Sequence, residues 1–173
     1  MTIKTTAAWL AAALMLTSAP AFAAGSHDGG HGDGHQSQAA DDHHDDMAIG
    51  SPGKASEASR TINVAMKETD SGMIFEPAEI KVKRGETVRF QVVNEGELEH
   101  EFVMDASPEI EEHKEMMQRF PEMIHDDPNS ARLQPGETGE VVWNFTKSGS
   151  FEFACLIPGH YESGMHGPLI VTE

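Results

Sequence analysis

The chain has 173 residues and is strongly acidic, with 12 Lys and Arg residues against 29 Asp and Glu residues and a formal net charge of −17 at pH 7. This charge argues against nucleic acid as a partner, because the phosphate backbone repels an acidic surface. The single cysteine, Cys155, excludes an internal disulfide, so packing must stabilise the one domain that a chain of this length predicts.

Residues 1–23 have the three parts of a secretory signal peptide. Lys4 gives a positive start, an apolar run extends from Ala7 to Leu16, and Ala21-Phe22-Ala23 fits a small-residue cleavage site. The apolar run is well short of the ~20 residues that a membrane-spanning helix needs. We therefore expect the protein to be exported, to lose this segment and to reside in the periplasm without a membrane anchor.

Residues 24–59 are rich in Gly, His, Asp and Ser and contain almost no large apolar side chains. Such a segment cannot bury enough apolar surface to fold, which predicts a disordered tail. Histidine-rich tracts commonly bind metals, so we expect loose metal binding by the tail, with a solvated polar linker as the alternative. The tail histidines are His27, His31, His35, His43 and His44.

Residues 60–173 are predicted to form one all-β domain, a Greek-key β-sandwich with one short helical insertion. Short segments of alternating apolar residues, separated by turn signals, are typical of such a sandwich. Trp143 and Phe145 alternate with Val141 and are expected to fill the core. The predicted strands are Thr61 to Lys67, Ile80 to Val82, Val88 to Val92, His100 to Met104, Glu140 to Phe145, Gly149 to Cys155 and Pro168 to Val171.

The helical insertion begins at Ser107, which is expected to cap the helix, with Pro108 at the first helical position. A pattern of helical spacing follows until Pro121 stops it. We expect one face of this helix to pack on the sandwich. The residues that recur at this spacing are Ile110, His113, Met117 and Phe120.

A cysteine, a histidine and a methionine follow one another at fixed short spacing near the C-terminus, as Cys155, His160 and Met165. A thiolate, an imidazole and a thioether together suit both oxidation states of copper, which favours one-electron chemistry. A type 1 copper site needs a second histidine, and His100, just after an alternating strand, is the best candidate. The alternative is a buried structural cysteine in a loop whose glycines mark turns.

The helical insertion also gathers thioether and imidazole side chains, which could form a second copper site with a preference for Cu(I). The alternative is that the methionines fill the core, as methionines at helical spacing usually do. The residues of this second set are His113, Met116, Met117, Met123 and His125.

The C-terminal motif and its surroundings resemble the cupredoxins, the blue-copper family of plastocyanin, azurin and auracyanin. The similar segments lie within residues 60–173 and include Phe75-Glu76-Pro77, Ile80 to Phe90 and Gly149 to Cys155. Cupredoxins commonly carry Asn directly after the first histidine, whereas this chain has Glu101. The resemblance implies that one type 1 copper is bound by His100, Cys155, His160 and Met165.

Three functions are compatible with a single domain of this kind. We prefer a periplasmic copper-handling protein of copper tolerance, in which the tail gathers copper ions and the type 1 site binds, oxidises or transfers copper. The alternative is a mobile electron carrier of a respiratory chain that exchanges one electron with a protein partner. An enzyme such as a copper oxidase is the third interpretation, but the domain has no His-x-His pair for a catalytic copper, and fold alone does not settle function.

Overall fold

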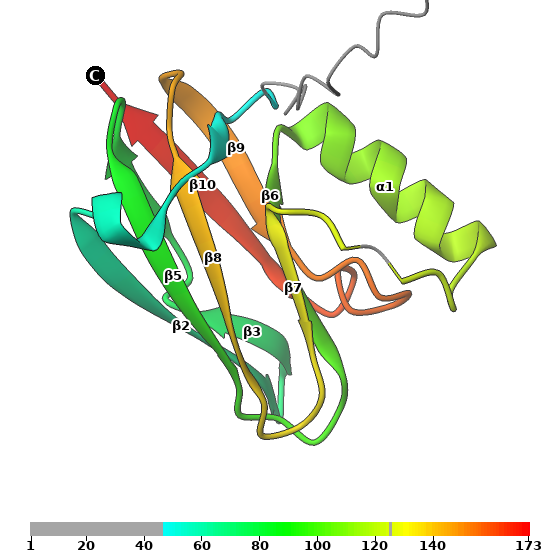
Figure 1. Ribbon diagram of the computed structural model, residues 1–173. Helices are drawn as coiled ribbons and strands as arrows, with labels where there is room; N and C mark the ends of the chain where they lie inside the picture. Colours follow the sequence, from blue (N-terminus) through cyan, green and yellow to red (C-terminus); the bar gives the residue numbers. More distant parts are fainter. Residues whose placement is uncertain (1–46, 125) are drawn as a thin grey trace, which may run out of the picture. The chain divides into compact units, whose positions relative to one another are not determined.

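The computed structural model describes residues 47–124 and 126–173, which form a two-layered β-structure with one α-helix and one short 3-10 helix, η1 (Ala55–Glu57) (Figure 1). The predicted signal peptide and the tail histidines His27, His31, His35, His43 and His44 lie outside the described residues. The all-β sandwich that the sequence predicts is confirmed for the domain.

Two five-stranded sheets make the sandwich. The first has the order β1 (Ser51–Pro52), β8 (Thr138–Asn144), β5 (Thr87–Asn94), β2 (Arg60–Thr69) and β3 (Gly72–Glu76). The second has the order β4 (Ile80–Lys83), β10 (His166–Thr172), β9 (Gly149–Ala154), β6 (His100–Asp105) and β7 (Ser130–Leu133). Strand β2 runs parallel to β5, and β10 runs parallel to β4, while the other pairs are antiparallel.

The inner faces of both sheets are built by every second residue, because successive side chains of a strand point to opposite faces. Along β5, Val88, Phe90 and Val92 are all fully buried, and Gln91 between them is exposed. Aromatic rings join the sheets: Phe75 meets Phe153 edge to face, with ring centroids 5.2 Å apart. The predicted core residues Val141, Trp143 and Phe145 are buried, which confirms that expectation.

The helix α1 (Ser107–Arg119) lies beside β6 and β9 in Figure 1. Its buried residues, Ile110 and Met117, pack against Val103, Ala154 and Leu156, which are separate from the main core. Since Phe102 and Phe153 lie in the main core, α1 covers the outer face of this part of the sheet. Within the described residues, no helix has both the length and the apolar character needed to cross a membrane.

Two details of the predicted helix are wrong. The capping position is Ala106 rather than Ser107, so Pro108 is the second helical residue, and no side chain caps the first turn. Phe120 follows the last helical residue and is 56% exposed, so it does not extend the buried face.

The predicted end of the tail at residue 59 is also wrong, because the domain already includes the residues from Met47 onward. Ile49 is fully buried in the main core, and β1 pairs with β8 through Ser51 and Asn144. Gly50 has a φ of +135°, and a Cβ on it would lie 2.0 Å from the carbonyl oxygen of Asn144. The surrounding polar residues concealed this segment in the sequence, since a single isoleucine gives no periodic pattern.

Replacing Ile49 with alanine tests whether this first segment belongs to the core. Ile49→Ala should lower the free energy of unfolding by about 2–5 kcal/mol, because it leaves a cavity where the side chain was fully buried. Chemical denaturation followed by tryptophan fluorescence measures the change. The control is Ile74→Ala at an exposed position of β3, where a loss of about 1 kcal/mol or less is expected. Equal effects of the two substitutions would mean that the segment does not stabilise the domain.

Candidate metal centre

The centre lies at one end of the sandwich, where inward-facing positions change from apolar to polar. His100 is the first residue of β6. It lies on the same face of this strand as Phe102, which is part of the main core. Cys155 directly follows β9 and lies on the same face as Phe153. Because β6 and β9 are antiparallel neighbours, the start of one strand meets the end of the other, which brings the imidazole and the thiol together.

The loop from β9 to β10 supplies His160 and Met165. Its backbone folds back on itself: the Cys155 amide donates to the Met165 carbonyl at 3.0 Å, and the Met165 amide donates to the His160 carbonyl at 3.1 Å. Gly159 and Gly164 have φ values of +89° and +97°, which glycine adopts without steric strain. The spacing seen in the sequence therefore corresponds to a tight loop that returns Met165 to the side of Cys155.

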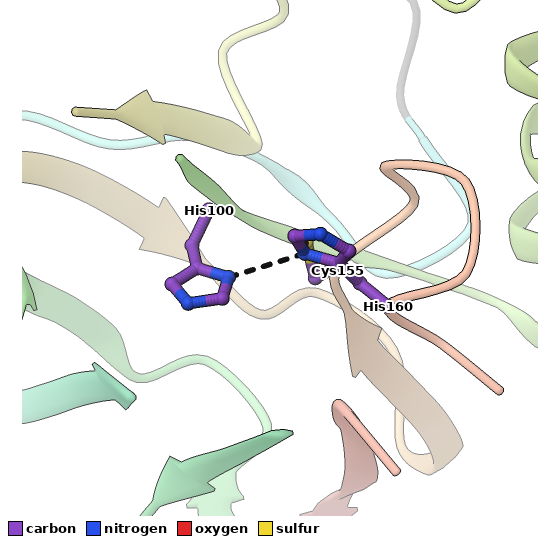
Figure 2. Close-up of side chains that lie close together, drawn as sticks. All are labelled: His100, Cys155 and His160. Carbon is purple, nitrogen blue, oxygen red and sulfur yellow. Dashed lines mark hydrogen bonds between the residues drawn. The ribbon is translucent and has the colours of Figure 1, made fainter. Parts of the chain in front are cut away.

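Three donor atoms converge where this loop meets the start of β6 (Figure 2). The Nδ1 atoms of His100 and His160 are 3.2 Å apart, and the Cys155 Sγ is 3.4 Å from the His160 Nδ1. All three donor atoms lie within 4.8 Å of one another. Ligands about 2.0–2.3 Å from a metal and about 120° apart in a plane would be separated by roughly 3.5–3.8 Å. The observed separations fit a trigonal metal site after small adjustments.

Burial distinguishes the members of the centre. His100, Cys155 and Met165 are fully buried, whereas His160 is 9% exposed and gives the centre its one edge near the surface. Met165 lies in the same core cluster as Cys155, as expected for a weak fourth ligand that approaches from the interior.

Burial favours the neutral forms of two donors of the centre, the Cys155 thiol and the His160 imidazole. Burial raises the pKa of the Cys155 thiol to about 12, although the backbone amides of Glu101 and Ile157 donate to its sulfur. The Glu101 amide is 3.3 Å from that sulfur. Burial also lowers the pKa of His160, which keeps its imidazole neutral and able to bind a metal. A bound cation would replace the thiol proton and stabilise the anionic sulfur, to which the two amides would still donate.

Glu101 occupies the position after the first histidine and is 2% exposed. Its Oε2 accepts a hydrogen bond of 3.4 Å from the Leu156 amide. The side chain therefore connects β6 to the residue after Cys155, while its own amide contacts the sulfur. This glutamate links the strand that carries His100 to the loop that carries Cys155, His160 and Met165.

Glu68 is a neighbour of the centre that sequence reasoning missed. Its Oε1 lies 2.8 Å from the His100 Nε2, the ring nitrogen that faces away from His160. Partial burial opposes ionisation of this carboxyl, but hydrogen bonds from the amides of Glu97 and Leu98, together with that from His100, lower its pKa to about 2. A signal was available, because Glu68 continues the inward-facing positions Val64 and Met66 of β2.

The described members of the second predicted set of copper ligands differ in burial. Met117 is fully buried between α1 and the sheet, which is the packing of a core methionine. His113 and Met116 are half-buried, Met123 is 36% exposed, and His125 lies outside the described residues. In residues 47–124 and 126–173, His100, Cys155 and His160 form the only cluster of at least three histidine, cysteine or carboxylate donors at metal-binding distances.

Comparisons with known proteins agree with this geometry. Residues 62–172 match the family of copper binding proteins described as the plastocyanin/azurin family. The copper-resistant cuproprotein CopI of Rubrivivax gelatinosus is 48% identical over 160 residues, which cover 92% of each chain. The protein of that name from Pseudomonas aeruginosa is 40% identical over 154 residues, which cover 72% of this chain and 83% of the relative.

Among solved structures, auracyanin B has the same fold, with a TM-score of 0.56 and 24% identity over 67% of this chain and 91% of that chain. The family match includes all four residues of the centre and nearly the whole sandwich. The chain therefore belongs to the plastocyanin/azurin family of copper-binding proteins, and copper is its cofactor.

Proposed function

We propose that this protein is a periplasmic cupredoxin of copper resistance. His100, Cys155, His160 and Met165 would hold one type 1 copper. The observation that carries this proposal is the convergence of two imidazole nitrogens and one thiol sulfur within 4.8 Å at buried positions. This donor set suits both Cu(I) and Cu(II), so the centre supplies one-electron chemistry when copper is bound.

The role in copper resistance is supported by the relatives. Two proteins called copper-resistant cuproproteins share 48% and 40% identity with this chain, and the first covers 92% of it. The periplasmic location is supported by the signal-peptide pattern of residues 1–23. In this role the tail would collect copper ions loosely, and the centre would hold a copper ion that can give one electron to a redox partner protein.

A mobile electron carrier is the second candidate, and the exposure of His160 favours it. The other three residues of the centre are fully buried, so an electron can pass most directly through the His160 imidazole to a docked partner. In either role the protein acts by binding copper and not as an enzyme. Copper tolerance of cells lacking the protein separates the two candidates, because loss of a respiratory carrier should reduce respiration rather than tolerance.

Replacing the cysteine tests the centre directly. Cys155→Ser should abolish the thiolate-to-copper charge-transfer band in the visible spectrum and weaken copper binding, because a hydroxyl is a poor soft ligand. Absorption spectra and metal content of the oxidised protein measure both effects. Met66→Leu, a substitution of another fully buried sulfur residue, is the control and should leave the band intact. Persistence of the band in Cys155→Ser would show that the proposed centre is wrong.

The tail is tested by deleting residues 25–46, because the residues from Met47 onward pack on the domain. Cells that export the shortened protein should tolerate less copper, while the visible spectrum of the centre stays unchanged. A variant with all five tail histidines replaced by serine keeps the length and should behave like the deletion. Full tolerance in both variants, at equal exported amounts, would exclude a copper-gathering role for the tail.

A second copper site in the helical insertion remains a proposal, supported by the two methionines that are not buried, Met116 and Met123. With the tail histidines replaced, the protein should bind one Cu(I) beyond the type 1 ion, because thioethers prefer Cu(I). Met116→Leu and Met123→Leu should lose that ion in a competition titration. Met117→Leu is the matched control, since a near-isosteric exchange in the core should change neither stoichiometry nor stability much. A titration that ends at one Cu(I) would exclude the site.

A further inference from the structure

The side of His100 that faces away from the copper is occupied by a carboxylate. Glu68 reaches this imidazole from β2, which belongs to the other sheet, and its Oε1 lies 2.8 Å from the Nε2. An ionised carboxylate accepts a hydrogen bond from the Nε2–H, which leaves the Nδ1 free for the metal and fixes the tautomer of the ring. The contact therefore places the negatively charged Glu68 carboxylate beside His100, a proposed copper ligand.

The position of this carboxylate is held from several directions. The Glu97 amide donates to its Oε2 at 2.9 Å, and the Leu98 amide donates to its Oε1 at 3.0 Å. The loop that carries these amides packs so closely that a Cβ on Gly96 would lie 2.4 Å from the Oε2. On the other side of the loop, the buried Asn94 accepts from the Gly96 amide at 2.9 Å and donates to the Leu98 carbonyl at 2.7 Å.

The charge of Glu68 is not neutralised by a basic side chain. Within the described part of the chain, its ion-pair partner is His100, and no Lys or Arg lies within ion-pair distance of it. The neighbouring Lys67 pairs instead with Glu76 and Glu95. On its solvent side Glu68 borders a hollow of about 590 Å³ that also exposes Asp70, Glu95 and Glu97. The negative charge is therefore available to act on the metal through His100.

We propose that Glu68 is a positioning residue that strengthens His100 as a copper ligand and stabilises Cu(II) over Cu(I), which lowers the reduction potential of the centre. This inference rests on the copper ligands proposed above. Reduction adds one electron to Cu(II) and gives Cu(I), without making or breaking a bond in the protein. Because the charge on the metal falls from two to one, a nearby fixed negative charge stabilises the oxidised state more strongly.

The decisive variant is Glu68→Gln, which keeps the shape and an oxygen that can accept from His100 but removes the charge. The affinity for Cu(II) should fall by about 10-fold or more, as is typical when a partner of a ligating histidine is changed, and the affinity for Cu(I) should fall less. A tenfold loss confined to Cu(II) corresponds to a potential about 59 mV higher for a one-electron couple. Spectroelectrochemistry of the full-length, copper-loaded protein measures this shift.

The matched control is Glu97→Gln, which removes one negative charge from the exposed neighbour in the same hollow and keeps the Glu97 amide that holds Glu68. Its potential should stay close to that of the original protein, since its side chain does not contact His100. Gly96→Ala is a second test that keeps every charge but displaces the carboxylate, and it should also raise the potential. If Glu68→Gln does not fold, the potential of Gly96→Ala tests the same inference.

The outcomes separate this inference from the assignment of the centre. A retained charge-transfer band with a raised potential in Glu68→Gln and an unchanged one in Glu97→Gln supports the role of Glu68. A retained band with the same potential in both variants overturns it and leaves the copper ligands intact. Equal upward shifts in both variants overturn it as well, because the effect would then be one of general surface charge. Absence of the band from the original protein would contradict the centre itself.

Discussion

The hydrogen bond from the Glu101 amide to the Cys155 sulfur, 3.3 Å long, joins the two strands that carry the first metal donors. It forms because β6 and β9 are neighbours in one sheet, so the start of β6 and the end of β9 share one end of the sandwich. The Glu101 side chain strengthens the same junction through the Leu156 amide. This junction fixes His100 and Cys155 against the sheet, while His160 and Met165 lie in the loop from β9 to β10.

Polar side chains at the end of an apolar core are costly unless each finds a partner. Here the partners form a connected set of hydrogen bonds. Asn94 donates to the Leu98 carbonyl, the Leu98 amide donates to Glu68, and Glu68 is bonded to His100. The remaining donor atoms of His100, Cys155 and His160 lie within 4.8 Å of one another, and a bound copper would satisfy them together. The centre therefore lies directly at the end of the hydrophobic core, since Phe102 and Phe153 lie on the same strand faces as His100 and Cys155.

The acidic surface of the protein and the exposure of His160 affect which partners can approach the centre. The chain carries 29 acidic residues against 12 basic ones, and acidic side chains border the hollow beside Glu68. A negative field of this kind attracts cations and basic partner proteins. Only the His160 edge of the centre approaches the surface, since His100, Cys155 and Met165 are fully buried.

The spacing of Cys155, His160 and Met165 alone indicated the copper site, because a single loop brings all three together and its glycines allow the necessary turns. The alternating strands predicted the sandwich for the same reason: period-two burial is a local property of the chain. Glu68 could not be connected to His100 in this way, since they belong to different sheets and meet only when the sheets pack. The inclusion of the residues from Met47 onward in the domain and the burial of Met117 were likewise decided by tertiary structure. A lone isoleucine or a methionine on a helix becomes a core residue only when a neighbouring sheet covers it.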